Sequence, residues 1–286
     1  MRRFLAAVLS VALVGCGSGR DEREWPAPSP ALWEMTAPDS GQAWLFGTIH
    51  ALPDGLEWRT PALEEALEQS GVLVVEVAEL GDSREAARQF SRRAHSPDLP
   101  PLLQRVPDAD RPALEAALRS AGLDESDFSS TESWAAALEL AGGLRRHESA
   151  NGVDRQLIAD AGQVIGLESL DQQFAMFDEL APQEQARLLV EVAREAGRGN
   201  QDEQVEAWLT GDLQRLTQES EQGMLADPAL RDRLQLARNR AWADRVASIA
   251  RAGERPFVAV GAAHMLGEEG LPALLAARGF SVRRVQ

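Results

Sequence analysis

The stretch GVLVVEV, residues 71–77, decides the fold class of this chain. Val72 to Val75 are four aliphatic residues in a row, with no polar residue between them. A half-exposed strand would alternate between apolar and polar residues, whereas an unbroken apolar run suits a strand that is buried on both faces. The stretch therefore predicts the interior of a sheet that has helices packed on either side.

Other parts of the chain extend this pattern. Further short strands are predicted at AWLF (43–46), GQVIGL (162–167), PFVAV (256–260) and FSVRRV (280–285). Long stretches rich in Ala, Leu, Glu and Arg favour helices, over residues 61–69, 82–94, 109–121, 133–146, 182–196, 202–210 and 227–252. The predicted fold is α/β, a mostly parallel or mixed sheet flanked by helices. The nearly all-helical regions 80–160 and 180–250 predict a helical cap.

Two copies of Gly-x-x-His follow predicted strands, one near each end of the chain. In AWLFGTIH the motif runs from Gly47 to His50, and in PFVAVGAAH it runs from Gly261 to His264. Ligands of α/β sheets bind beyond the carboxyl ends of the strands. We predict that each glycine permits a tight turn or a positive φ, which points the histidine back over the sheet edge.

Glu76 is the residue of GVLVVEV whose burial costs most. A carboxylate in an apolar strand needs compensation by a cation, a metal or hydrogen-bond donors. One explanation is a neighbouring arginine. The other is a metal shared with His50 and His264, because two imidazoles and a carboxylate suit Zn, Mn, Fe or Co and leave positions open for water. The residues themselves leave both explanations open.

Four more polar residues are candidates for supporting roles. Arg240, next to Asn239 in RNRAW, has the planar fork to bind a substrate carboxylate or to compensate Glu76, or it forms an ordinary surface ion pair. Asp154 in GVD and Glu168 in GLES are candidates to orient the histidines. The alternatives for these two are a helix cap and a loop carboxylate.

The remaining histidines and three tryptophans have simpler interpretations. His95 and His147 stand beside arginines in polar surroundings, which predicts surface positions. Trp134, Trp208 and Trp242 occur among Ala and Leu at helical positions, which predicts core anchors.

Together these segments resemble the TraB/GumN family. The resemblance rests on LFGTIHALPDGLEWRTPALEEALEQSGVLVVEV, GVDRQLIADAGQVIGLESLDQQFAMFDEL, AWLTGDL, RNRAWADRV and VAVGAAHMLGEEGLPALLAARGFSVRRV, in that order. It covers about residues 33–286. The family is similar to the Tiki proteins, metal-dependent proteases with two Gly-x-x-His motifs and a required glutamate, and more distantly to the erythromycin esterase and ChaN-like group. The resemblance implies a metalloprotease-like site at His50, Glu76 and His264, with Mn or Co as the metal, and it implies no particular substrate.

The function that these observations favour is metal-dependent hydrolysis of a peptide or protein. Whether Glu76 is a metal ligand or a general base is left open. The sequence contains no Gly-x-Ser-x-Gly elbow and no glycine-rich phosphate loop, which counts against a serine triad and a nucleotide site. The alternatives are a non-catalytic lipoprotein that binds a peptide or haem, and a signalling or scaffold protein in which the same residues form a buried polar network.

The beginning of the chain has the features of a lipoprotein signal. A positive start, an apolar core and the lipobox-like LVGC predict that residues 1–15 are removed and that Cys16 is lipidated. The alternative is a chance match around a stray cysteine. Gly17 in place of an aspartate predicts an outer-membrane anchor that faces the periplasm. The polar, proline-rich stretch to residue 32 predicts a flexible tether, and residues 33–286 form the predicted domain.

The charge of the chain argues against nucleic acid as a partner. Its formal net charge is −16, and loss of the two arginines within residues 1–15 would make it −18. Phosphate binding draws on clustered basic residues, which this balance does not favour. The predicted partners are therefore a peptide or protein substrate and, through the lipid anchor, a membrane.

Overall fold

A mixed sheet forms the centre of the computed structural model, which describes residues 23–37, 40–81 and 83–286. In the described residues the strands are β1 Leu32–Ala37, β2 Ser40–Thr48, β3 Val72–Val77, β4 Val164–Glu168, β5 Pro256–Gly261 and β6 Ser281–Arg284. Their spatial order is β4-β3-β5-β2-β1-β6. The first four in this order are mutually parallel, and β1 runs antiparallel to both of its neighbours. The predicted α/β class is confirmed.

Twelve α-helices accompany the sheet in the described part of the chain. They are α1 Pro61–Gln69, α2 Ser83–Arg93, α3 Arg111–Ala121, α4 Ser133–Gly143, α5 Val153–Asp160, α6 Leu170–Asp178, α7 Pro182–Arg198, α8 Gln201–Leu209, α9 Leu213–Gln222, α10 Pro228–Arg231, α11 Ala237–Arg251 and α12 Leu271–Ala276. None of the described helices is long and apolar enough to cross a membrane.

Strand β3 is buried on both faces, as its unbroken apolar run predicts. Val72 and Val74 pack with α11 and α12 on one face of the sheet. Leu73 and Val75 pack with α1, α5 and α8 on the other. Because successive side chains of a strand point to opposite faces, a four-residue aliphatic run fills two cores at once.

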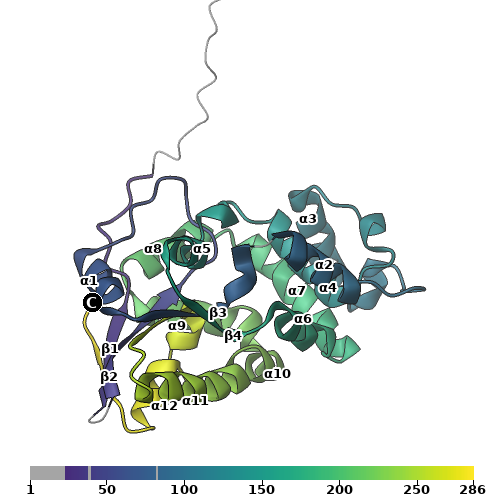
Figure 1. Ribbon diagram of the computed structural model, residues 1–286. Helices are drawn as coiled ribbons and strands as arrows, with labels where there is room; N and C mark the ends of the chain where they lie inside the picture. The colour runs from purple at the N-terminus through teal and green to yellow at the C-terminus, as the bar shows by residue number, and fades with distance from the viewer. Residues whose placement is uncertain (1–22, 38–39, 82) are drawn as a thin grey trace, which may run out of the picture.

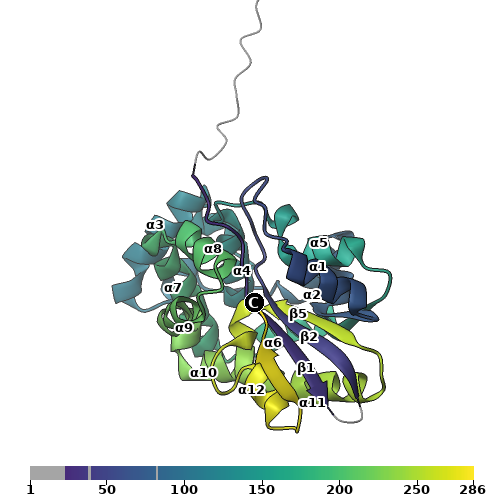
Figure 2. The ribbon, with the colours of Figure 1, turned by 90° about the vertical axis from the view of Figure 1, so that its left-hand side faces the viewer.

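A separate hydrophobic core lies in the helical part of the molecule. Its buried residues come from α3, α4, α7 and α10 and from the turns beside them, and α6 contributes partly buried residues. Figures 1 and 2 show these helices gathered beside the sheet. The predicted cap over 80–160 and 180–250 is therefore too large. Helices α5, α8 and α11 belong to the sheet layers instead, because their apolar faces pack against the strands.

The chain before β2 departs from the prediction of a flexible tether. Strand β1, which the sequence analysis did not predict, buries Leu32, Trp33 and Met35. The residues just before it are also held, since the Ser29 amide donates to the Leu209 carbonyl over 2.7 Å. A flexible tether thus does not describe residues 23–31. The predicted signal segment, Cys16 and residues 17–22 lie outside the described residues.

The predicted burial of the remaining histidines and of three tryptophans is confirmed for all but His147. His95 is exposed, as predicted. The prediction for His147 is wrong, because only 7% of its side chain is exposed and its Nε2 lies 2.9 Å from Asp202 Oδ1. Trp134, Trp208 and Trp242 are buried, which confirms their prediction as core residues.

The long helix predicted over 227–252 is interrupted. A π-helical segment, Asp232–Leu236, separates α10 from α11. Wider turns of this kind are frequent at functional sites. Within the segment, the Gln235 side chain donates to the Ala263 carbonyl over 2.5 Å. This contact fixes the start of α11 beside the second Gly-x-x-His motif.

Candidate active site

The ends of three adjacent parallel strands bring His50, Glu76 and His264 together. Strand β5 lies between β3 and β2 in the sheet, and Gly261 at its end pairs with Thr48. A Cβ built on Gly261 would lie 3.1 Å from Glu76 Oε1, 3.7 Å from His264 Cδ2 and 3.9 Å from His50 Nε2. The three side chains therefore surround one small space, which Gly261 keeps open. Their juxtaposition agrees with the sequence prediction, and their roles remain predictions.

The glycines of the two motifs act differently from the sequence prediction. Gly261 has a φ of −47°, and Gly47 does not have a positive φ either. Of the two predicted alternatives, a tight turn or a positive φ, the positive φ is not present, and Gly261 leads directly into a 3-10 turn, Ala262–Met265. A Cβ on Gly47 would lie only 3.0 Å from the Ala262 Cα, so this glycine is needed for close packing of the two strand ends. In both motifs the glycine supplies space rather than an unusual backbone conformation.

Replacement of Gly261 by alanine tests this interpretation. The added methyl group would enter the space between the histidines and Glu76, because its nearest neighbour is Glu76 Oε1 at 3.1 Å. We expect the affinity of the cluster for the predicted metal to fall by at least about 10-fold. This is the low end of the loss in affinity that follows when the partners of metal ligands are disturbed. Titration calorimetry measures the affinity, and Gly162→Ala, which has no atom within 4 Å of its Cβ position and no positive φ, is the control for glycine replacement. Unchanged affinity in Gly261→Ala would contradict the interpretation.

His50 is oriented by Asp154. The imidazole Nδ1 lies 2.8 Å from Asp154 Oδ2, and the other carboxylate oxygen accepts a hydrogen bond from the Thr48 hydroxyl. A carboxylate only accepts, so Nδ1 of His50 is the donor and Nε2 is directed elsewhere. The Asp154 charge raises the pKa of His50 to about 9. The His50 side chain is 65% exposed, which makes it the most exposed member of the cluster.

The GVD stretch explains how Asp154 reaches His50. A Cβ on Gly152 would lie 2.5 Å from the His50 carbonyl oxygen, so only glycine allows this approach. The Val153 amide donates to the Ile49 carbonyl over 3.0 Å. These contacts place the first turn of α5 against the end of the first Gly-x-x-His motif. Of the two interpretations of Asp154, the contact with a histidine is the one present.

His264 is oriented by Asn239 of α11. The Asn239 amide nitrogen donates to the Glu269 carbonyl over 2.7 Å, which leaves its Oδ1 facing His264 Nδ1 at 2.5 Å. The amide oxygen accepts only, so Nδ1 of His264 is again the donor. Burial lowers the pKa of His264 to about 4, so this imidazole is neutral at neutral pH and has a lone pair on Nε2.

Glu76 is held by hydrogen bonds on both carboxylate oxygens. The Gly261 amide donates to Oε1 over 2.7 Å, and Arg238 Nη2 donates to Oε2 over 2.7 Å. Burial would raise the pKa of Glu76, but His264, Arg238 and His50 together with the Gly261 amide lower it to about 2. Glu76 is therefore ionised. Its Oε1 lies 3.9 Å from His264 Nε2.

Arg238 is the residue of the site that sequence analysis missed. Only 13% of its side chain is exposed, and its guanidinium lies 4.4 Å from the centre of the Trp242 ring. The sequence contained a signal for it: Arg238 precedes the buried Trp242 by four residues and so lies on the same helix face. Arg240, the predicted partner of Glu76, lies on another face.

The structure thus separates the two arginines of RNRAW. Arg240 is 49% exposed on its side chain, and it pairs with Asp232 over 2.8 Å and with Glu269 over 3.4 Å. It does not contact Glu76, and the surface ion pair is the arrangement present. Glu168 contacts neither histidine but binds Arg238, with 2.6 Å between its Oε1 and Nη2. Burial raises the pKa of Glu168.

The donor chemistry of the cluster fits a divalent transition metal. Asp154 and Asn239 each occupy the Nδ1 of one histidine, which leaves the Nε2 atoms of His50 and His264 as ligand atoms. Such outer contacts are the usual way in which proteins orient metal-binding histidines. Glu76 adds an ionised carboxylate beside them. A metal at His50 would have to displace the proton that its raised pKa retains.

The side chains do not already form a ready-made metal-binding group. Within residues 23–37, 40–81 and 83–286, no group of three or more His, Cys, Asp or Glu side chains is arranged to hold a metal ion. Two contacts of Arg238 explain part of this, because its guanidinium donates to Glu76 and its Nη1 lies 3.3 Å from His264 Nε2. Two of the donors are thus engaged by an arginine.

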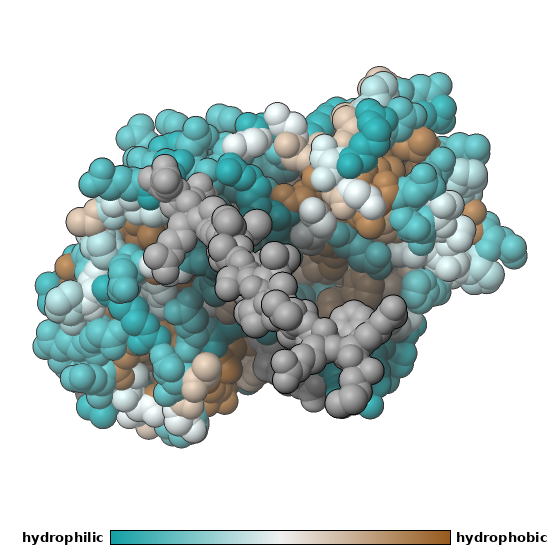
Figure 3. Space-filling view, turned by 90° about the horizontal axis from the view of Figure 1, so that it is seen from above, coloured by the Kyte–Doolittle hydropathy of each residue, from teal (hydrophilic) through white to brown (hydrophobic). Residues whose placement is uncertain are grey.

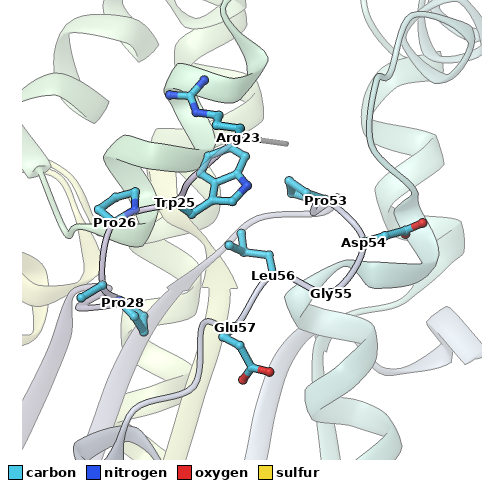
Figure 4. Close-up of a pocket in the computed structure, with 10 residues that line it drawn as sticks. Arg23, Trp25, Pro26, Pro28, Pro53, Asp54, Gly55, Leu56 and Glu57 are labelled. Atoms are coloured by element: carbon cyan, nitrogen blue, oxygen red, sulfur yellow. The ribbon is translucent and has the colours of Figure 1, made fainter. Parts of the chain in front are cut away.

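One cavity in the described part of the chain lies outside the cluster. It has a volume of about 410 Å³ and is lined by two segments, residues 23–28 and 53–57. Figure 4 shows Trp25 and Leu56 on the two segments that face each other. No member of the cluster lines this cavity. Figure 3 shows hydrophobic side chains gathered on one part of the surface that is seen from above.

Comparison with known proteins adds a family match. The model of the TraB/PrgY/gumN family matches residues 31–284. No curated protein and no solved structure matches the chain. The matched range contains both Gly-x-x-His motifs and every residue that holds the cluster.

Proposed function

The chain belongs to the TraB/PrgY/gumN family, and from this premise and the geometry of the site we propose that it is a metal-dependent hydrolase of the peptidase type. The observation that carries the proposal is the matched support of the two histidines. Each Nδ1 donates to an oxygen that only accepts, so Nε2 is the nitrogen of each ring that a metal would bind, beside an ionised Glu76. Outer partners that hold the second ring nitrogen are the usual arrangement of metal-binding histidines.

The proposed metal ligands are His50, His264 and Glu76, with Mn, Co or Zn as the ion. Such a metal polarises a scissile carbonyl and lowers the pKa of a bound water. Glu76 is proposed as a ligand, because its ionised carboxylate borders the same small space as the two imidazoles.

The surroundings of these ligands supply orientation and access. The Gly261 amide fixes Glu76, and Asp154 and Asn239 fix the two rings. His50 is the exposed member, so the substrate is proposed to approach from its side. The hydrophobic surface in Figure 3 is proposed to contact apolar side chains of a peptide.

The proposed location is the periplasmic side of the outer membrane. It rests on the lipobox-like LVGC, with Cys16 as the lipidated residue and Gly17 after it. Incorporation of a radiolabelled fatty acid in the parent chain and its loss in Cys16→Ser would support the anchor.

Metal content of the full chain, purified in a mild detergent, tests the proposed function. After incubation with Mn, Co, Fe or Zn and dialysis, mass spectrometry is expected to find close to one equivalent in the parent. His50→Ala and His264→Ala are expected to lose most of it, because each removes a ligand nitrogen. Circular dichroism checks that both variants fold.

His95→Ala is the matched control, since His95 is exposed and lies outside the cluster. It is expected to keep its metal. A parent that retains none of the four ions would contradict the proposal. A haem absorption band in its place would favour the ligand-binding alternative.

A further inference from the structure

Arg238 engages the same atoms that the proposed metal needs. Its Nη2 donates to Glu76 Oε2 over 2.7 Å, and its Nη1 lies 3.3 Å from His264 Nε2. His264 carries its proton on Nδ1, so its Nε2 accepts from the guanidinium. A metal that binds Glu76 and His264 therefore has to displace this cation.

Glu168 provides a second position for the arginine. Its two carboxylate oxygens accept from Arg238 Nε over 3.2 Å and from Nη2 over 2.6 Å. This is the two-pronged contact to which a guanidinium is best suited. The bond to Glu76 shares Nη2 with the bond to Glu168. The arginine is thus anchored on Glu168 and reaches Glu76 with one nitrogen.

Two further contacts hold the guanidinium of Arg238, and neither of them involves Glu76. Nη1 donates to the Leu234 carbonyl over 2.8 Å, and the plane of the group packs on the Trp242 ring. Leu234 belongs to the π-helical segment before α11. Neither contact depends on Glu76 or His264.

We propose that Arg238 is a positioning residue that competes with the metal for Glu76, and that Glu168 is the carboxylate onto which it withdraws when the metal binds. This inference rests on the proposed function, because the competitor is the proposed metal. It makes the Arg238–Glu168 pair a regulator of metal affinity without direct contact to the metal. Glu76 is then never left as an uncompensated buried charge.

Titration calorimetry with Mn²⁺ alone, on the full chain in detergent at neutral pH, tests the competition. Arg238→Gln removes the competitor and frees two carboxylates, so we expect Mn²⁺ to bind at least about 10-fold more tightly than to the parent. Glu168→Gln removes the alternative partner and leaves the arginine on Glu76. We expect it to bind Mn²⁺ at least about 10-fold more weakly.

Arg245→Gln is the matched control. Arg245 lies on the same helix, and its Nη1 donates to the Leu167 carbonyl over 2.9 Å rather than to a carboxylate. We expect no change in Mn²⁺ affinity. If Arg238→Gln does not fold, the double variant Arg238→Gln/Glu168→Gln removes a carboxylate together with its partner. It is still expected to bind more tightly than the parent.

The outcomes separate the inference from the proposed function. Equal affinities in the parent, Arg238→Gln and Glu168→Gln would overturn the competition and leave the metal site standing. Binding in Arg238→Gln but not in the parent would support the competition and contradict metal dependence of the parent. No binding in any variant would overturn both.

Discussion

Glu76→Gln is expected to lower both metal affinity and hydrolytic rate by at least about 100-fold, the upper end of what the loss of an outer-shell partner costs. The substitution keeps the size of the side chain and an oxygen for the Gly261 amide, but it removes the negative charge. Arg238 then still has Glu168 as its partner, so we expect the fold to survive. The rate is measured with a library of quenched fluorescent peptides, and metal content is measured by mass spectrometry.

Glu79→Gln is the control for this experiment. Glu79 lies three residues further along the chain and is exposed, so neither metal content nor rate is expected to change. A variant at Glu76 that keeps its metal but loses its rate would reassign Glu76 from ligand to general base. A variant that keeps both would contradict a role for Glu76 in the site.

Arg238→Met is expected to lower the free energy of unfolding by about 3–5 kcal/mol, the typical cost of breaking a buried ion pair by removing one partner. The substitution leaves Glu76 and Glu168 without their common cation, and both side chains are only 11% exposed. Urea denaturation in the presence of a chelator, followed by circular dichroism, measures the change. A decrease in the free energy of unfolding of less than about 1 kcal/mol would contradict a stabilising role of the buried ion pairs of Arg238.

The neighbouring Arg240→Met is the matched control. Its ion pairs with Asp232 and Glu269 join side chains that are about half exposed, and such surface pairs contribute about 0–1 kcal/mol. Adding Glu168→Gln to Arg238→Met is expected to restore part of the stability, because it removes one of the two stranded charges. Equal losses of unfolding free energy in Arg238→Met and Arg240→Met would show that the burial of Arg238 does not strengthen its ion pairs.

Much of the fold was predictable because it depends on local patterns. The unbroken apolar run of β3 predicts burial on both faces, and the length and composition of α1 and α7 predict helices. Strand β1 was missed because LWEMTA follows a proline-rich stretch and has an acidic residue within it. Its place is decided by pairing with β2 and β6, a long-range contact that local propensity does not contain.

The candidate site likewise contains residues that the sequence predicts and residues that it does not. His50, Glu76 and His264 were found because motif and burial cost mark them in the sequence. Arg238 was not, since RNRAW offers two arginines and the choice depends on the phase of the helix. The π-helical segment just before it shifts the phase of α11 relative to α10, and nothing in DRLQL marks such a turn. The role of the motif glycines also needed the structure, because close approach of two backbones is a tertiary property.

The strand order has a consequence for how the protein is made. Strand β5 fits between β3 and β2, although it comes from near the end of the chain. Pairings of such high sequence separation slow folding, since a long loop has to close before they form. The ribosome therefore releases nearly the whole polypeptide before the sheet is completed. A chain that ends before residue 256 lacks both strand β5 and His264, so it cannot assemble the cluster.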